Sequence, residues 1–294
     1  MKSGIITIVG SPNVGKSTLM NKIIGEKVAI VSNKPQTTRN RIYGILNQED
    51  CQYVFLDTPG LHRAKTRLGD YMVKVVRESV VDVDAVVLMV NPTPTISLNT
   101  QDLIESMKRL SCPTILAINK LDMLEKKDVL LNVMDIYRQE HDFTAILPIS
   151  ARTGKGVDEL LKTLKKFIPE GPLLFPEDMI TDQPERQIMA EIIREKLLRN
   201  LEKEIPHGTA IEITKFSQRD DGIIDVEATI FCEKGSHKGI IIGKNGDMLK
   251  KISSEARKDM EHFMGEKVFL QNWVKVKENW RDNANYVRNF GYTE

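Results

Sequence analysis

The sequence of 294 residues contains only three cysteines, Cys51, Cys112 and Cys232, which lie far apart. No CxxC pair and no histidine at metal-ligand spacing accompanies them, so the pattern excludes a disulfide framework or zinc site and favours a reducing cytosol. No apolar stretch approaches the ~18 residues of a membrane span. The N-terminal MKSGIITIVG runs straight into a glycine loop, which leaves no room for a signal peptide. We therefore expect a soluble cytoplasmic protein, with attachment to a membrane surface left open.

An excess of charge of one sign is lacking as well. The chain has 42 Lys and Arg against 41 Asp and Glu, a formal net charge of +1. This balance argues against a protein that coats nucleic acid over its whole surface, but it can hide a local basic patch. A chain of this length exceeds the usual size of a single core, so two domains are expected.

Short apolar runs alternate with helix-compatible segments between residues 4 and 168. The runs are GIITIVG, CQYVFLD, DAVVLMVN, PTILAINK and AILPIS. Such nearly continuous apolar runs are typical of strands covered on both faces, as in a parallel sheet with helices on either side. We therefore predict an α/β first domain over residues 1–170 with a mostly parallel sheet.

Prolines mark a boundary after this domain. They recur through PEGPLLFPEDMITDQP and prevent a regular element, so we interpret residues 171–184 as a linker. Beyond it, an apolar residue at every fourth position from Met189 to Ile205 predicts an amphipathic helix. Two alternating strands, a short glycine-containing helix, a longer helix over about 246–263 and the strand KVFLQNWVKVK follow. The order α-β-β-α-α-β predicts a smaller α+β domain over residues 185–294.

The segment GSPNVGKS, from Gly10 to Ser17, matches the GxxxxGK[ST] pattern of a phosphate-binding loop. It follows a predicted strand and precedes a helix-like segment, a context that disfavours the competing interpretation of a chance glycine turn. Backbone amides and the helix N-terminus of such a loop attract phosphate oxygens. We expect Lys16 to meet the β- and γ-phosphates and the Ser17 hydroxyl to ligate Mg²⁺.

A second motif, NKLD at Asn119 to Asp122, indicates which base is bound. A carboxylate can accept hydrogen bonds from both N1–H and the 2-amino group of guanine, whereas adenine has no such pair of donors on that edge. We expect Asp122 to select guanine, Lys120 to pack over the base plane and Asn119 to tie this loop to the P-loop. Alone, the tetrapeptide also fits a solvated helix cap.

Two further motifs lie at the ends of predicted strands. In DTPG, Asp57 is placed to hold Mg²⁺, and the Gly60 amide can approach a γ-phosphate; alone, the stretch also fits a simple turn. SARTGKG offers backbone amides to the guanine carbonyl. The residues expected to contact the nucleotide are Gly10, Asn13, Val14, Gly15, Lys16, Ser17, Thr18, Asp57, Gly60, Asn119, Lys120, Asp122, Ser150 and Ala151.

In these motifs the chain resembles the Era family of GTPases. GSPNVGKSTLMNKIIGEK, KPQTTRNRIYGI, DTPGLH, NKLD and SARTGKG look like its nucleotide motifs, and IIGKNGDMLKKISSEARKDM and LQNWVKVKENWRDN look like its C-terminal RNA-binding domain. The resemblance implies a KH domain of the bacterial type II topology and binding near the 3′ end of 16S ribosomal RNA. It also implies GTP-dependent assistance of small-subunit assembly and peripheral association with the membrane. We further expect a monomer.

The resemblance also ranks two adjacent threonines in PQTTRNR. It implies that Thr38 is the Mg²⁺ ligand, whereas chemistry alone could not choose between Thr37 and Thr38. In DTPGLH, Leu61 occupies the place where a water-orienting glutamine is often found, and leucine can neither orient water nor accept a proton. We therefore expect slow intrinsic turnover. His62 is titratable, but a lone histidine in a loop is usually solvated.

Asn13 is the candidate for the missing polar group. In related GTPases that share PNVGKS and a hydrophobic residue after DTPG, the P-loop asparagine helps to hold a monovalent cation near the phosphates. K⁺ is therefore a candidate cofactor beside GTP or GDP and Mg²⁺, unless ribosomal RNA completes the site. The residues expected to carry catalysis are Asn13, Lys16, Thr38 and Gly60.

The tetrapeptide GKNG is a GxxG loop, which in a KH domain clamps about four nucleotides; alone it also fits a helix-to-helix turn. Residues 175–294 carry 19 Lys and Arg against 22 Asp and Glu, yet residues 234–258 carry seven against two. Basic charge therefore concentrates around the loop, where phosphate contacts would need it. The expected RNA contacts are Lys238, Gly243, Lys244, Asn245, Gly246, Lys250 and Lys251.

Some residues and functions stay open at this level. Trp273 lies in a strand pattern and is expected in the core, and the sequence does not decide whether the C-terminal tail touches RNA. The alternatives are a membrane-linked regulatory GTPase whose second domain binds protein, an RNA-modification accessory enzyme and an ATPase. No methyl-donor site, metal cluster or catalytic cysteine constellation supports the second, and Asp122 argues against the third.

Overall fold

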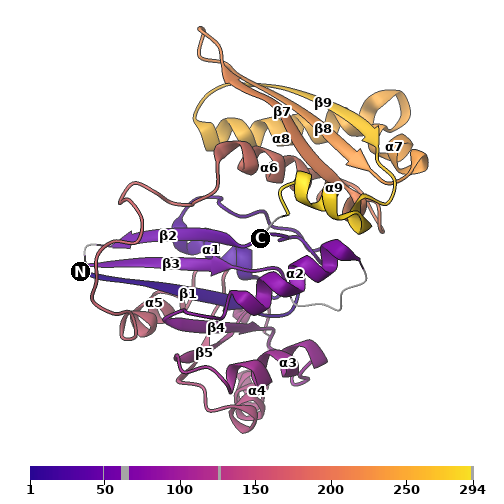
Figure 1. The fold of residues 1–294 in the computed structure, drawn as a ribbon. Coiled ribbons are helices and arrows are strands. Elements are labelled where there is room, and N and C mark those ends of the chain that lie inside the picture. Colours follow the sequence, from indigo (N-terminus) through magenta and orange to yellow (C-terminus); the bar gives the residue numbers. More distant parts are fainter. Residues whose placement is uncertain (49, 61–65, 125–126, 293–294) are drawn as a thin grey trace. The chain divides into compact units, whose positions relative to one another are not determined.

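The computed structural model describes residues 1–48, 50–60, 66–124 and 127–292 (Figure 1). The chain forms two compact units. The first unit comprises Met1–Ala29, Thr38–Arg63 and Met72–Asp182, and the second comprises Ile30–Thr37, Ala64–Tyr71 and Gln183–Glu294. The boundaries at residues 170 and 185 stay a prediction. The grouping of two short internal segments with the C-terminal part was not predicted from the sequence.

The first unit is built on a mixed sheet in the order β2-β3-β1-β4-β5-β6. β2 pairs antiparallel with β3, and the other pairings are parallel. The predicted mostly parallel sheet is therefore confirmed, but β2 was not among the predicted strands. The strands are β1 Lys2–Val9, β2 Ile42–Gln48, β3 Cys51–Asp57, β4 Ala85–Val90, β5 Thr114–Ile118 and β6 Ala145–Pro148.

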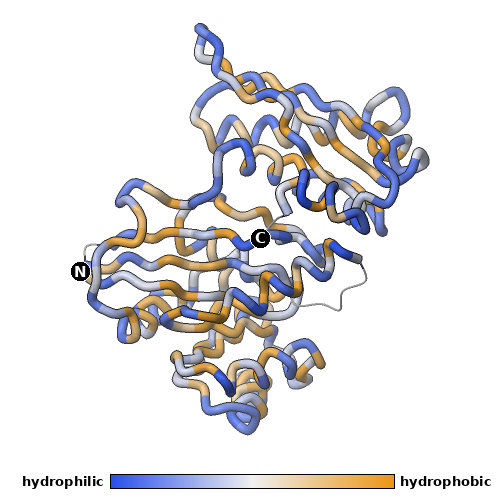
Figure 2. The backbone as a smooth tube through the Cα atoms, in the orientation of Figure 1, coloured by the Kyte–Doolittle hydropathy of each residue, from blue (hydrophilic) through white to orange (hydrophobic). Residues whose placement is uncertain are grey.

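Helices cover both faces of this sheet, which explains why its strands are apolar on both sides. The alternating residues Val87 and Met89 of β4 pack with α1 and α5, whereas Val86 and Leu88 pack with α3 and α4. Figure 2 shows the orange strands between these layers. The helices of this region are α1 Lys16–Ile24, α2 Arg67–Glu78, α3 Leu98–Met107, α4 Lys127–Glu140, α5 Val157–Lys165 and the short 3₁₀ helix η1 Leu121–Met123.

The proline-rich segment contains no helix or named strand between residues 169 and 184, as predicted. It is nevertheless fixed to the first unit. The Ile45 amide donates to the Ile180 carbonyl at 2.9 Å. The amides of Leu174 and Phe175 donate to the buried Gln52 side chain at 2.8 and 3.0 Å.

The second unit contains a three-stranded sheet in the order β7-β8-β9. β7 and β8 are antiparallel, β8 and β9 parallel. Alternate residues Val226, Ala228 and Ile230 of β8 pack in one core with residues of α6 and α8, and the predicted order α-β-β-α-α-β is observed. The elements are α6 Glu185–Asn200, η2 Pro206–Gly208, β7 Ala210–Gln218, β8 Ile224–Cys232, α7 Gly235–Ile242, η3 Lys244–Gly246, α8 Asp247–Met264, β9 Val268–Val276, η4 Trp280–Asp282 and α9 Ala284–Asn289.

Two predictions about this unit were wrong. Trp273 is not in the core: its side chain is 43% exposed. It alternates with the buried Val274 along β9 and so faces away from α6 and α8. The first helix ends at Asn200, so Leu201 and Ile205 lie beyond it. Trp280 is fully buried and donates its indole N–H to the Gly208 carbonyl at 2.9 Å.

No helix within the described ranges is long and apolar enough to cross a membrane.

Candidate functional site

The motifs of the first unit meet at the carboxyl ends of its parallel strands. The P-loop follows β1, Asp57 ends β3, Asn119 follows β5 and Ser150 follows β6. In an open α/β sheet this edge is where ligands bind. The fold therefore brings together four motifs that are spread over about half of the chain.

The P-loop depends on glycine at its turn into α1. Gly15 has φ +106°, and a Cβ there would lie 2.3 Å from the Asn119 amide nitrogen. Any side chain would therefore collide with the base-recognition loop. Val14 is buried, and its carbonyl accepts from the Asn119 Nδ2 at 2.7 Å, while Thr18 is half-buried in the first turn of α1.

Lys16 is held at the centre of the loop. Its ammonium donates to the carbonyls of Gly10 at 3.1 Å and Ser11 at 3.2 Å. Burial lowers the pKa of Lys16 to about 8, and the nearby Asp57 partly opposes that shift. Anionic phosphate oxygens would favour the charged ammonium in the same way, so the loop is arranged to receive them.

Three oxygen-bearing side chains converge beside Lys16. The Ser17 hydroxyl donates to Asp57 Oδ2 at 2.6 Å, and the Thr38 hydroxyl lies 3.0 Å from Ser17 Oγ and 3.4 Å from the same carboxylate oxygen. Asp57 is fully buried, and its Oδ1 has no hydrogen-bond partner. The Thr37 hydroxyl instead donates to the Lys34 carbonyl at 2.7 Å.

This donor set fits Mg²⁺, which prefers hard oxygen ligands and keeps places for water and phosphate. A buried carboxylate oxygen without a partner is a free ligand position. Burial raises the pKa of Asp57, and Lys16 opposes this; a divalent cation would also favour the ionised carboxylate. Within the described ranges there is no cluster of three or more His, Cys, Asp or Glu that could hold a metal.

The base-recognition loops are linked to the P-loop by side chains. Asn119 Oδ1 accepts from the Ala151 amide at 2.8 Å, and the Lys120 ammonium donates to the Asn13 carbonyl at 2.8 Å. The predicted link from Asn119 to the P-loop is observed, and Asn119 also contacts the loop at Ala151, which was not predicted. Lys120 adopts a left-handed backbone with φ 66°, and its contact with Asn13 lays its stem along the edge of the loop.

Asp122 is presented as an ionised acceptor. The Ser150 hydroxyl donates to Oδ1 at 2.5 Å and Arg152 pairs with Oδ2 at 2.7 Å. The hydrogen bond from Ser150 is the main reason that the pKa of Asp122 lies below its usual range. A carboxylate that stays ionised can accept both donors of guanine. Sequence reasoning missed Arg152, although it lies inside the SARTGKG motif.

Gly60 lies close to the P-loop. A Cβ atom added at this residue would come within 2.8 Å of the Pro12 Cα. Asn13 is exposed and has φ 62°. The predictions about the hydrolytic water concern Leu61 and His62. Both residues lie outside the part of the chain that the structure describes.

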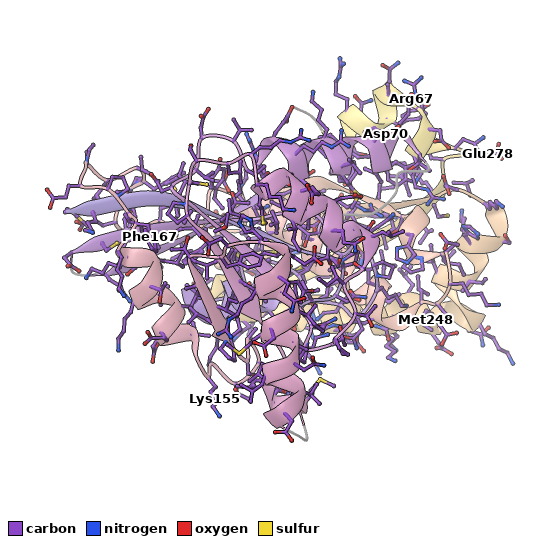
Figure 3. All side chains as sticks on the ribbon, turned by 90° about the horizontal axis from the view of Figure 1, so that it is seen from below. Arg67, Asp70, Lys155, Phe167, Met248 and Glu278 are labelled. Atoms are coloured by element: carbon purple, nitrogen blue, oxygen red, sulfur yellow. The ribbon has the colours of Figure 1, made fainter. Side chains whose placement is uncertain are left out.

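The predicted RNA loop connects α7 and α8. Gly243 has φ +76°, and a Cβ there would lie 2.7 Å from the Cβ of Met248, a side chain labelled in Figure 3. Only glycine fits this turn. Lys244 and Asn245 are exposed and Gly246 is half-buried; Lys250 and Lys251 are exposed on α8, and Lys238 is half-buried on α7. Exposed lysines therefore lie in the loop and on the helix that follows it.

Comparison with known proteins agrees with both sites. A family model described as a 50S ribosome-binding GTPase matches residues 5–120, and a KH domain model matches residues 204–281. The chain is 51% identical to GTPase Era of Clostridioides difficile over 294 residues, which covers 100% of this chain and 99% of that protein. It is 50% identical to GTPase Era of Ruminiclostridium cellulolyticum over 291 residues, 99% of this chain and 97% of that protein.

Two solved structures match the whole fold. A variant of Aquifex aeolicus Era bound to GDP and AlF4⁻ superposes with a TM-score of 0.96 at 40% identity, with 100% of both chains covered. The same values hold for Era in complex with MgGDPNP and nucleotides 1506–1542 of 16S ribosomal RNA. Identity at this level over the full length, together with the two matched domains, is decisive: the chain belongs to the Era family of GTPases, and it is a GTPase with a C-terminal KH domain.

Proposed function

We propose that this protein is a Mg²⁺-dependent GTPase that binds 16S ribosomal RNA near its 3′ end through the GxxG loop and assists assembly of the small ribosomal subunit. The observation that carries the proposal is the presence of both sites in one chain. A guanine-nucleotide site and an exposed GxxG loop occur in a chain that matches, along its whole length, an Era structure holding MgGDPNP and 16S RNA.

The contacts at the strand ends support the roles that we propose for the nucleotide site. Lys16 and the P-loop amides bind the phosphates, Ser17 and Thr38 together with Asp57 hold Mg²⁺, and the Gly60 amide approaches the γ-phosphate. Mg²⁺ held by these residues would supply positive charge that neutralises the negative charge developing on the phosphate oxygens during transfer. Asp122 reads guanine, and the hydrogen bond from Ser150 orients that carboxylate.

The RNA role rests on the α7–α8 loop. Its amides and the Lys244 ammonium contact the phosphate backbone, and Lys238, Lys250 and Lys251 add charge nearby. The protein acts in the cytoplasm as a monomer, and any peripheral association with the membrane is secondary to RNA binding.

Crosslinking of the full-length protein to RNA in growing cells tests the proposal. The bound segments are mapped by sequencing, and the membrane fraction is probed for the protein in parallel. We expect crosslinks to concentrate at the 3′ end of 16S RNA in small-subunit precursors. A protein found mainly at the membrane without ribosomal RNA would contradict the proposal.

We further infer that a monovalent cation near Asn13 replaces the polar group that Leu61 cannot supply. GTP hydrolysis is then expected to run roughly tenfold faster in K⁺ than in Na⁺, which corresponds to about 1.4 kcal/mol of barrier. The measurement is phosphate release at matched ionic strength, and Asn13→Ala should remove the difference between the two salts. Equal rates in both salts, with and without the 16S RNA segment, would contradict the inference.

A further inference from the structure

Helix α6 carries three consecutive charged residues that are all buried. The side chains of Arg194, Glu195 and Lys196 are 1%, 0% and 4% exposed. One face of an amphipathic helix cannot hold three successive residues, because each is rotated by about 100° from the last. Buried charges persist only with partners. The partners of this triplet therefore show what surrounds α6 in the second unit.

Part of what surrounds α6 is the segment Ile30–Thr37, which belongs to the second unit. Glu195 Oε1 accepts from the Val31 amide at 3.0 Å. Arg199 donates to the same carboxylate oxygen at 3.0 Å and to the Val31 carbonyl at 3.3 Å. Lys196 donates to Glu195 Oε2 at 2.9 Å and also to Asp259 of α8. The start of the segment is thus attached to the helical layer of the KH domain.

Arg194 holds the other end of the segment. Its Nη2 donates to the carbonyl of Thr37, and its Nε donates to Glu191 Oε1 at 2.8 Å. Glu191 also accepts from Nη2, so the guanidinium is clamped by a carboxylate in a bidentate arrangement. The Lys34 ammonium donates to the Leu201 carbonyl just after α6.

The peptide bond after Thr37 leads directly to Thr38. That residue is buried in the first unit, where its hydroxyl lies beside Ser17 and Asp57. A peptide group is planar, so the Thr37 carbonyl oxygen and the Thr38 Cα belong to one rigid plane. Two torsions, φ and χ1 of Thr38, then separate the carbonyl that Arg194 binds from the hydroxyl that ligates the metal.

We propose that Arg194 is a positioning residue for the metal ligand Thr38. By fixing the Thr37 peptide it sets where the Thr38 hydroxyl lies, and residues of the KH domain thereby act on nucleotide binding. This inference rests on the proposed role of Thr38 at Mg²⁺. This proposal predicts which nucleotide is affected. A Mg²⁺ ligand beside the γ-phosphate favours binding of GTP over GDP. Loss of Arg194 should therefore weaken GTP binding more than GDP binding.

The test uses the full-length protein and compares Arg194→Met with Arg199→Met. Arg199 lies on the same helix and contacts the same segment, but its contacts are to Val31 and Glu195. We expect Arg194→Met to weaken binding of a non-hydrolysable GTP analogue in Mg²⁺ roughly tenfold, within the usual range of coupling between sites. GDP affinity should change less than about twofold, and Arg199→Met should show no selectivity.

Because a buried charge is removed, folding is checked by thermal unfolding and by RNA binding without nucleotide. Glu191→Gln is the second variant: it loosens the clamp on Arg194 from a more exposed position, and a smaller loss in the same direction is expected. Arg194→Lys should restore part of the GTP affinity. Equal losses for GDP and the GTP analogue, or equal effects at Arg194 and Arg199, would overturn the proposal.

Thr38→Ala separates this inference from the proposed function. If Thr38→Ala weakens the GTP analogue but Arg194→Met and Glu191→Gln do not, Thr38 binds Mg²⁺ without help from Arg194, and the inference fails alone. If Thr38→Ala itself leaves the affinity for the GTP analogue in Mg²⁺ unchanged, the proposed metal role fails and the inference fails with it.

Discussion

Replacing Asp122 by asparagine is expected to shift nucleotide preference from GTP towards xanthosine triphosphate. The carboxylate accepts two hydrogen bonds from guanine, and each bond to a charged group contributes about 1.5–3 kcal/mol. Loss of both should lower GTP affinity roughly 100-fold or more. An asparagine amide can donate to the 2-oxo group of xanthine, so affinity for that nucleotide should rise. Titration with both triphosphates in Mg²⁺ gives the two dissociation constants.

The matched control for this change is Arg152→Ala. Arg152 pairs with the same carboxylate at 2.7 Å, but its side chain is 75% exposed. Exposed ion pairs contribute little, so GTP affinity should change less than about fivefold. Ser150 can still donate to an asparagine oxygen, which keeps the loop in place. An Asp122→Asn protein that still prefers GTP would show that the guanine edge is read elsewhere.

Replacing Lys244 by aspartate should abolish most binding of a single-stranded 16S RNA segment. The change removes a cation from the exposed GxxG loop and places an anion where the phosphate backbone approaches. We expect at least a roughly tenfold loss of affinity and a shallower salt dependence, with the slope reduced by about one phosphate contact or more. Fluorescence anisotropy over a series of salt concentrations measures both quantities.

Lys267→Asp provides the control, because it makes the same charge change at an exposed lysine beyond the C-terminal end of α8. That position is separated from the GxxG loop by the whole length of the helix. RNA affinity should fall much less there, and GTP hydrolysis without RNA should be unaffected in both variants. Equal losses at Lys244 and Lys267 would mean that overall charge, and not the loop, governs binding.

The nucleotide site was largely predictable because its chemistry needs fixed residue types at strand ends. Gly15 fits where any Cβ would strike Asn119, and Asn119 links the P-loop to Ala151. These constraints are local to short motifs, so they are visible in the sequence. The ranking of Thr38 above Thr37 came from the family resemblance, and the hydroxyl distances agree with it.

The burial of single side chains was harder to predict. It depends on which helices and segments pack on each strand or helix, and short sequence motifs do not contain this information. Trp273 was expected in the core because it lies in a strand pattern. Helices pack on the opposite face of β9, and the alternation of Trp273 with Val274 was the better signal. The buried triplet at Arg194 to Lys196 looks like a solvated helix face in the sequence. Two of its residues, Arg194 and Glu195, contact the segment Ile30–Thr37, which lies more than 150 residues earlier in the chain.

The central claim is that one chain binds both a guanine nucleotide and 16S RNA, and from it we expect the nucleotide state to change the affinity for RNA. The direct measurement is the affinity of the full-length protein for the 3′ segment of 16S RNA, in Mg²⁺, with a non-hydrolysable GTP analogue and with GDP. We predict tighter RNA binding with the GTP analogue, by a factor within the range of about 5 to 150 that is typical of coupled sites. Equal RNA affinities in the two nucleotide states would contradict the account.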